Sequence, residues 1–237
     1  MSSVSSPKLA ACRLAALGDR ALVLHLGGRI DPPTFRAIRS LSRRLADQPP
    51  AGMLECVPAF TTLAIYYDPL RTSQTELISL VSKLIDTPDS TIETQPRLVE
   101  IPVCYGGEYG SDLDFVGQHA SLTAPEVIEV HSAADYLVHM IGFAPGFPYL
   151  GGMSSKIAVP RRASPRLKIP PGSVGIAGDQ TGIYPLETPG GWQLIGRTPL
   201  ALFLPERDPP TLLQAGDIVR FRPITPEQFR QLAEPSA

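Results

Sequence analysis

The chain has 237 residues, of which 43% are hydrophobic and 19% are charged, a composition typical of a soluble globular protein with one large or two modest domains. Its formal net charge at neutral pH is −2, which argues against any bulk attraction to nucleic acid or to an anionic membrane. The 26 prolines argue against a helical bundle, because proline favours turns and edge strands.

The cysteines and the apolar stretches indicate a cytoplasmic protein. The three cysteines are odd in number and far apart, with no Cys-x-x-Cys pair, which argues against a disulfide framework and against a thiolate zinc site. Charged residues interrupt the N-terminal apolar run, so no secretory signal is predicted. The uncharged stretch 136–155 cannot form a membrane helix, since Pro145, Pro148 and several glycines would break it.

The first half of the chain predicts two strand–strand–helix units followed by one more strand. The predicted strands cover residues 8–16, 20–26, 53–60, 62–67 and 92–105, and the predicted helices 32–46 and 72–85. Asp31 is expected to cap the first helix, and Ser73 with Glu76 to form a capping box on the second. Pro96 and Pro102 are expected to confine the last strand to an edge or a crossover. This order predicts an α+β domain with helices on one face of a mainly antiparallel sheet.

The second half predicts a mainly β domain. Short extended segments separated by glycine and proline turns lie at residues 136–141, 173–177, 182–186, 192–197, 200–204 and 217–222. Many short strands at this spacing indicate a closed or nearly closed β-barrel. Short helices are expected at 111–120, 123–131 and 226–233, opened by the capping boxes Ser111/Asp114, Thr123/Glu126 and Thr225/Gln228. We place the two domains at residues 1–95 and 96–237.

Residues 136–199 carry the candidate binding site. They hold six cations against two anions in a chain of net charge −2. Arg161, Arg162 and Arg166 lie on a proline-bounded loop, and guanidinium groups on a stiff loop can grip a carboxylate or phosphate through paired hydrogen bonds. The alternative is a solvated surface loop with unpaired arginines.

Aromatic side chains surround this loop in the sequence. Tyr149, Tyr184 and Trp192 could form the walls of a site for a small acidic ligand or for a partner's side chain. The alternative is that the aromatic residues fill the barrel, which is the favoured interpretation for Phe143 and Phe147.

Glu187 and His131 are the candidate proton-transfer groups. A carboxylate in an apolar, proline-flanked turn can have a raised pKa, although Glu187 could instead form a salt bridge with a nearby arginine. His131 could instead be a cation that interacts with a helix C-terminus. Gln180 could orient a ligand amide or cap a turn. The four histidines lack metal-ligand spacing, and no phosphate-binding P-loop is present, so no metal site and no nucleotide loop are predicted.

Several long motifs identify a family. Residues 142–152 (GFAPGFPYLGG), the loop 160–168 and residues 178–199 resemble the B subunit of the bacterial ATP-dependent 5-oxoprolinase, a family also called allophanate hydrolase subunit 1 or KipI-like. The likeness covers nearly the whole chain, including residues 104–110 (CYGGEYG) and 216–221 (GDIVRF). Asp179 departs from the pattern, because asparagine is expected there more often, and any hydrogen bond donated by that side chain to a ligand would be lost.

The resemblance implies an α+β N-terminal domain and a cyclophilin-like β-barrel domain. It implies ATP-dependent opening of the lactam of 5-oxoproline to give glutamate. It also implies companion A and C subunits, the latter similar to the other half of a urea carboxylase carboxyltransferase domain. Because this chain has no recognisable ATP loop, ATP is expected to bind in the assembled complex, at a site shared with or belonging to a partner.

Two other functions stay open at this point. A different branch of the same family inhibits a sporulation histidine kinase by binding it, so a non-enzymatic regulator is the first alternative. An exposed apolar patch near residues 142–152 without a lined cleft would favour it. A component of a urea-carboxylase or allophanate-type enzyme, with a related cleft and a different small substrate, is the second alternative.

Overall fold

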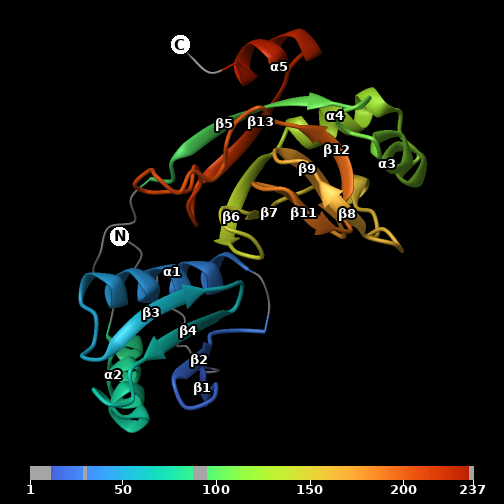
Figure 1. The fold of residues 1–237 in the computed structure, drawn as a ribbon. Coiled ribbons are helices and arrows are strands. Elements are labelled where there is room, and N and C mark those ends of the chain that lie inside the picture. Colours follow the sequence, from blue (N-terminus) through green and yellow to red (C-terminus); the bar gives the residue numbers. More distant parts are fainter. Residues whose placement is uncertain (1–11, 29–30, 88–94, 235–237) are drawn as a thin grey trace. The chain divides into compact units, whose positions relative to one another are not determined.

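The computed structural model describes residues 12–28, 31–87 and 95–234 (Figure 1). The chain divides into two compact units, residues 1–94 and 95–237, and each is described by itself. This division lies one residue from the predicted boundary. The strand predicted at residues 92–105 as the last element of the first domain begins at Leu98 and belongs to the barrel, and residues 92–94 of that prediction lie outside the described residues. That each unit folds as an independent domain stays a prediction.

The first unit is built on an antiparallel sheet with the strand order β1-β2-β4-β3. Its elements are β1 Arg13–Ala16, β2 Ala21–His25, α1 Pro32–Asp47, β3 Met53–Pro58, β4 Thr62–Tyr67 and α2 Gln74–Asp86. The strand predicted from residue 8 begins at Arg13, and residues 8–11 of that prediction lie outside the described residues.

Both helices of this unit pack on the same face of the sheet. Alternate strand residues such as Leu22 and Leu24 share one buried cluster with Ile38 of α1 and Leu77 of α2, as the strand period of two and the helix period of 3.6 require. The predicted caps are confirmed. Asp31 accepts a hydrogen bond from the Thr34 backbone N–H at 2.8 Å, and the capping box that opens α2 is formed on both sides.

Within residues 95–234, seven strands close into a barrel in the order β10-β7-β6-β13-β5-β12-β9, with β9 and β10 paired to complete the ring. The barrel strands are β5 Leu98–Tyr105, β6 Asp135–Ile141, β7 Pro148–Gly151, β9 Ser173–Ala177, β10 Gln180–Ile183, β12 Gln193–Arg197 and β13 Ile218–Pro223. The β5–β13 pair is parallel and the other pairs of the barrel are antiparallel. A separate two-stranded sheet joins β8 Arg166–Ile169 to β11 Thr188–Gly190.

The remaining elements of the second unit are short helices. They are α3 Leu113–Ala120, α4 Ala124–Ser132, a 3-10 turn at Ser155–Ile157 and α5 Pro226–Ala233. Val116 of α3 and Val127 of α4 join the barrel core, so these two helices lie against the barrel wall (Figure 1). The predicted capping boxes of α4 and α5 are confirmed.

Four predictions for the second unit are wrong. Residues 200–204 do not form a strand, because only Phe203 makes an isolated bridge, to Thr211. Pro102 does not mark an edge, since β5 lies between β13 and β12. The barrel accommodates this proline because β12 pairs only with the last two residues of β5.

The Ser111/Asp114 capping box is not formed, and α3 begins after Asp112 without a side-chain cap. Finally, β7, β8 and β11 occupy glycine- and proline-rich segments that were interpreted as loops.

In the part of the chain that the structure describes, no helix is long and apolar enough to cross a bilayer.

Candidate active site

A pocket of about 300 Å³ opens in the second unit, and we call it the Trp192 pocket. It lies between the β6–β7 loop, the segment that precedes β8, and the turn between β11 and β12. The side chains and backbone that line it are Phe143, Phe147, Tyr149, Arg161, Arg162, Pro165, Tyr184, Pro189, Gly190, Gly191 and Trp192. Of the residues that the sequence proposed for anion binding, Arg161, Arg162, Tyr149, Tyr184 and Trp192 therefore meet at one pocket.

Phe147 is the centre of the aromatic wall. Its ring meets those of Tyr149, Tyr184 and Trp192 edge to face, with centroids 5.0–5.5 Å apart, the geometry that aromatic quadrupoles favour. Phe147 is buried, with 1% of its surface exposed, but it belongs to a cluster with Tyr184 and Trp192 that is separate from the barrel core, so it does not fill the barrel as predicted. Phe143 differs from that interpretation, because it is 64% exposed beside the pocket.

Glycines allow the aromatic side chains to pack this closely. A Cβ atom at Gly190 would collide with the Tyr184 hydroxyl oxygen, and one at Gly182 would lie 2.9 Å from the Pro148 carbonyl oxygen and 3.0 Å from the Phe147 ring. Real Cβ atoms essentially never come closer than 3.0 Å to another heavy atom. Glycine at these positions is therefore a requirement of the pocket wall.

Two consecutive turns shape the β6–β7 loop. The Ala144 backbone N–H donates to the Gly142 carbonyl at 2.9 Å, which makes a γ-turn centred on Phe143, whose φ is 69°. Such a turn is rare and strained for a residue with a side chain. The Phe147 N–H then donates to the Ala144 carbonyl at 3.0 Å, across a turn with Pro145 second and Gly146, at φ 82°, third. This is the type II pattern, and together the turns fix the rim of the pocket.

A buried carboxylate holds two of the three loop arginines. Asp112 Oδ1 accepts hydrogen bonds from Arg162 Nη1 at 3.1 Å and from Arg166 Nη2 at 2.8 Å. Its Oδ2 accepts the backbone N–H of Leu194 at 2.7 Å. Asp112 is only 6% exposed. We call Asp112, Arg162 and Arg166 the Asp112 cluster.

Asp112 was missed by sequence reasoning, which instead predicted a capping box on either side of it. A signal existed, because Asp112 lies two residues after the end of the glycine-rich segment 106–110. That segment lies against β12, where the Gly106 N–H donates to the Ile195 carbonyl at 3.0 Å and the Asp112 N–H to the Leu194 carbonyl at 2.8 Å. A Cβ atom at Gly110 would collide with the Ile195 carbonyl. The glycines therefore bring the backbone close enough to β12 to bury Asp112.

Arg161 is the arginine of this loop that remains open to the pocket. Arg161 is exposed. Within residues 12–28, 31–87 and 95–234 its side chain has no hydrogen-bond or ion-pair partner. Its charge acts on Tyr184 across the pocket. Burial raises the pKa of the Tyr184 hydroxyl to about 12, and a hydrogen bond from the Trp192 backbone and the Arg161 charge act in the opposite direction.

His131 does not reach the pocket. It is completely buried in the barrel, with Nδ1 2.8 Å from the Tyr105 hydroxyl and Nε2 3.0 Å from Thr181 Oγ1. Because the Thr181 hydroxyl proton is donated to the Gly175 carbonyl, Oγ1 accepts from His131 Nε2, which assigns the Nε2–H tautomer. Burial lowers the pKa of His131 to about 3. The ring is therefore neutral, so the interpretation as a cation at a helix end is wrong.

Glu187 and Gln180 also lie outside the lining of the pocket. The Glu187 side chain is 55% exposed and forms an ion pair with Lys168 at 3.1 Å. The expected salt bridge is thus formed, but with lysine in place of arginine. Gln180 begins β10 and pairs with Ala177 of β9. The proposed proton-transfer roles of Glu187 and His131 stay predictions, and the geometry of the pocket does not support them.

Comparison with known proteins places this chain in a family. The family described as carboxyltransferase domain, subdomain C and D, matches residues 12–213. The B subunit of 5-oxoprolinase from Bacillus subtilis is 45% identical over 239 residues, covering 94% of this chain and 98% of the relative. The chain belongs to the family of 5-oxoprolinase B subunits. The Escherichia coli protein of the same name is 44% identical over 213 residues, covering 89% of this chain and 95% of the relative.

A more distant structure shares the fold of this member of the 5-oxoprolinase family. The crystal structure of a urea amidolyase from K. lactis superposes with a TM-score of 0.76 over 93% of this chain, at 20% sequence identity. The match takes up 15% of that longer chain. The likeness is one of fold.

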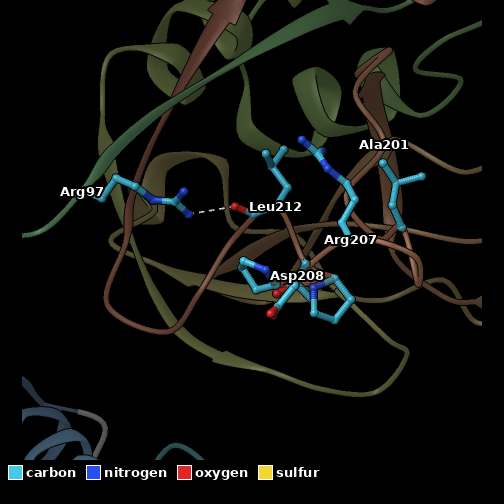
Figure 2. Close-up of a pocket in the computed structure, with 9 residues that line it drawn as sticks. Arg97, Ala201, Arg207, Asp208 and Leu212 are labelled. Atoms are coloured by element: carbon cyan, nitrogen blue, oxygen red, sulfur yellow. Dashed lines mark hydrogen bonds between the residues drawn. The ribbon is translucent and has the colours of Figure 1, made fainter.

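A second, smaller pocket of this family member has Arg97 and Arg207 in its lining, and we call it the Arg97 pocket (Figure 2). Its volume is about 160 Å³. Figure 2 shows the Arg97 guanidinium directed at the Leu212 carbonyl, to which it donates at 2.7 Å, and the same group forms an ion pair with Asp217. Because its main cation is already paired, the Arg97 pocket is a weaker candidate for an anion site than the Trp192 pocket.

The lining of the Trp192 pocket suits binding and orientation. It contains two guanidinium groups and five aromatic rings, but no carboxylate, imidazole or thiol. With a pKa of about 12, the Tyr184 hydroxyl stays protonated at neutral pH and can serve as a hydrogen-bond donor rather than a base. Among the described residues, no group of three or more His, Cys, Asp or Glu side chains could hold a metal ion.

Proposed function

We propose that this chain is the B subunit of an ATP-dependent 5-oxoprolinase, which converts 5-oxo-L-proline to L-glutamate together with companion A and C subunits. The single observation that carries the proposal is the Trp192 pocket, in which aromatic walls and an unpaired arginine meet. The names of the two bacterial relatives support the same activity. We further propose that the barrel is of the cyclophilin-like type and that the complex works in the cytoplasm, where the three cysteines, which form no disulfide among the described residues, would stay reduced.

The pocket fits the chemistry of the proposed substrate. 5-Oxoproline is a small, nearly flat lactam ring with one carboxylate. The ring can pack against Trp192, Tyr149 and Tyr184, while a guanidinium from the loop before β8 takes the carboxylate through paired hydrogen bonds. A volume of about 300 Å³ lies at the lower end of the usual range for small-molecule sites.

The chemistry itself needs more than this pocket offers. A lactam carbonyl is a poor electrophile, so its oxygen would first displace ADP from the γ-phosphorus of ATP. One water then adds to the activated carbon and the C–N bond breaks. A second water releases phosphate from the resulting acyl phosphate, leaving glutamate. These steps require a base for water and cations for the phosphates, and we place the base and the ATP site on the companion subunits.

Reconstitution tests the proposal. The chain is purified alone and mixed with its companion subunits, and glutamate and phosphate are measured with 5-oxoproline and ATP present. The proposal predicts no product from the chain alone, and ATP-dependent glutamate from the mixture. Glutamate release by the unaided chain, or full activity of the companions without it, would contradict the proposal.

The two alternatives are less well supported. An inhibitor of a sensor histidine kinase was expected to show an exposed apolar patch without a lined cleft. Phe143 is indeed exposed, but it stands at the rim of a lined pocket. A kinase autophosphorylation assay with and without the protein separates this alternative from the enzyme. A role in a urea-carboxylase or allophanate-type enzyme rests on a likeness of fold at 20% identity.

A further inference from the structure

The three arginines of the loop before β8 are not equivalent. Arg162 and Arg166 share the carboxylate of Asp112 and are partly buried, with side chains 35% and 23% exposed. Arg161 lines the pocket and keeps its guanidinium free of ion pairs within the described ranges. A ligand anion that approaches the pocket therefore meets one uncommitted guanidinium.

We propose that Arg161 binds the carboxylate of the ring substrate, and that Asp112 is a positioning residue that fixes the backbone from which Arg161 extends. The inference rests on the proposed function and names the group that recognises the substrate. It also separates Arg161 from its two neighbours, which the sequence placed together as three equal anion-binding residues.

The backbone on both sides of Arg161 is anchored. On one side, the Pro160 carbonyl accepts a hydrogen bond from Gln193 Nε2 at 3.1 Å. On the other side, the Arg162 N–H donates to the Gly191 carbonyl at 2.8 Å. The anchors Gly191 and Gln193 lie where the turn after β11 enters β12, and Trp192 stands between them. Arg161 and the aromatic wall are thus held by the same piece of chain.

Asp112 connects these anchors to the barrel. One carboxylate oxygen takes the Leu194 N–H of β12 and the other takes the guanidinium groups of Arg162 and Arg166. A buried carboxylate with three hydrogen bonds is a rigid fixed point, because charge-assisted bonds are short and strong. It also neutralises part of the loop charge, which lowers the repulsion that would otherwise push Arg161 away from Arg162.

The ligand class follows from the number and kind of groups at the pocket. One free guanidinium can bind one carboxylate, because its planar pair of N–H donors matches the two carboxylate oxygens. A nucleoside triphosphate would need several cations for its phosphates and carboxylate ligands for its Mg²⁺. The lining of the Trp192 pocket holds no carboxylate. The aromatic rings suit the apolar carbons of a small ring.

A double-mutant cycle in the reconstituted complex tests both parts of the proposal. Arg161→Met should raise KM for 5-oxoproline about 10- to 100-fold, the usual loss for a hydrogen bond to a charged group, with KM for ATP unchanged. Asp112→Asn, which keeps the shape of the side chain and removes its charge, should raise the same KM about 5- to 10-fold. Since Asp112 acts through Arg161, the double variant should be no worse than Arg161→Met.

Lys168→Met is the matched control. It removes the same charge from the same segment, but the Lys168 side chain is 76% exposed and pairs with Glu187, so KM for 5-oxoproline should stay at the wild-type value. The proposal is overturned if Arg161→Met behaves like this control. It is also overturned if the effects of Arg161→Met and Asp112→Asn multiply, because Asp112 would then act independently of Arg161.

A complex without 5-oxoprolinase activity would refute the proposed function and leave the carboxylate site to a binding test. Trp192 is the single tryptophan of the chain and lines the pocket, so its fluorescence reports occupancy. In the full chain, 5-oxoproline should bind more tightly than 2-pyrrolidone, the same ring without a carboxylate, and Arg161→Met should abolish that difference. Equal affinities of the wild-type chain for the two rings, or no binding of either, would overturn the proposal.

Discussion

The barrel unit contains two buried polar clusters that behave differently. The first, which we call the His131 cluster, consists of His131, Tyr105, Thr181 and Tyr136. Both ring nitrogens of His131 have hydrogen-bond partners, and the His131 carbonyl accepts a hydrogen bond from the Tyr136 hydroxyl at 2.7 Å. The Asp112 cluster is charged and borders the Trp192 pocket. Two of its donors, Arg162 Nε and Arg166 Nη1, are buried without a hydrogen-bond partner among the described residues.

The difference between the clusters separates structural from binding roles. A buried polar network whose members are all satisfied holds a fold in one arrangement. The Asp112 cluster is charged, and it fixes the backbone from which the open guanidinium of Arg161 lines the Trp192 pocket. His131 was attractive as a catalytic group from its residue type alone, whereas its saturated surroundings indicate a structural role.

The largest expected effect is on stability. His131→Ala removes a buried ring, its two hydrogen bonds and its stacking on Phe221 at 4.5 Å, which should lower the free energy of unfolding by about 4–5 kcal/mol. Denaturant unfolding measures this. The folded fraction should keep its KM for 5-oxoproline in the complex. An unchanged stability combined with a raised KM would reverse the assignment of the two clusters.

The pH dependence of the free energy of unfolding should also show that His131 is buried as a neutral ring. Because burial lowers the pKa of His131 from 6.5 to about 3, the unfolded chain takes up the proton first as the pH falls. The contribution of the neutral ring is complete above pH 6.5 and is lost progressively toward pH 3, by on the order of 4–5 kcal/mol.

His131→Gln is the comparison for this pH dependence, because glutamine does not titrate. The Asp135–Arg220 ion pair, which lowers the pKa of Asp135, weakens in acid in both proteins and cancels. Urea unfolding between pH 7 and pH 4 should show a shallower dependence for the variant. Parallel curves would mean that His131 is not held neutral in the folded chain.

A smaller effect is expected at the pocket wall, where two adjacent glycines form a matched pair. A Cβ atom at Gly190 would collide with Tyr184 and lie 2.7 Å from Ile169, whereas one at Gly191 would be 3.7 Å from Pro165, an ordinary contact. Gly190→Ala should lower the free energy of unfolding by about 1–3 kcal/mol and raise KM for 5-oxoproline. Gly191→Ala should leave the free energy of unfolding close to the wild-type value. Equal behaviour of the two variants would show that the wall tolerates displacement.

The smallest effect is expected at Glu187. Its ion pair with Lys168 is exposed on both sides, and such pairs contribute less than about 1 kcal/mol. Glu187→Gln should therefore leave the melting temperature and kcat of the complex close to wild type. A fall in kcat of about 100-fold, the scale of general acid–base catalysis, would restore Glu187 as a base and place the reacting centre outside the Trp192 pocket.

Regular periodicity made the first unit predictable. In α1, the buried residues Phe35, Ile38, Leu41 and Leu45 recur at helical spacing. This stripe and the caps at Asp31 and Ser73 depend on neighbours within one or two helical turns, so a single sequence contains them. In the second unit, β7, β8 and β11 were not recognised because proline and glycine interrupt the alternation of side chains. Their strand character comes from pairing with distant segments.

The candidate site was predictable in part for the same reason. The arginines and aromatic residues lie within one stretch whose glycines and prolines signal a fixed shape. Asp112 lies 50 and 54 residues before its arginine partners and 82 residues before Leu194, and no local pattern carries that information. For His131 a signal was present, since it follows Val127 by one helical turn on a face that is buried in α4.

The central claim is that the Trp192 pocket holds the ring substrate during turnover. The most direct measurement is the fluorescence of Trp192 in the assembled complex as 5-oxoproline is added, with the signal of companion tryptophans removed by subtracting a Trp192→Phe complex. The account predicts a saturable change with a midpoint close to KM for 5-oxoproline. A difference signal that stays constant while 5-oxoproline saturates glutamate formation would contradict it.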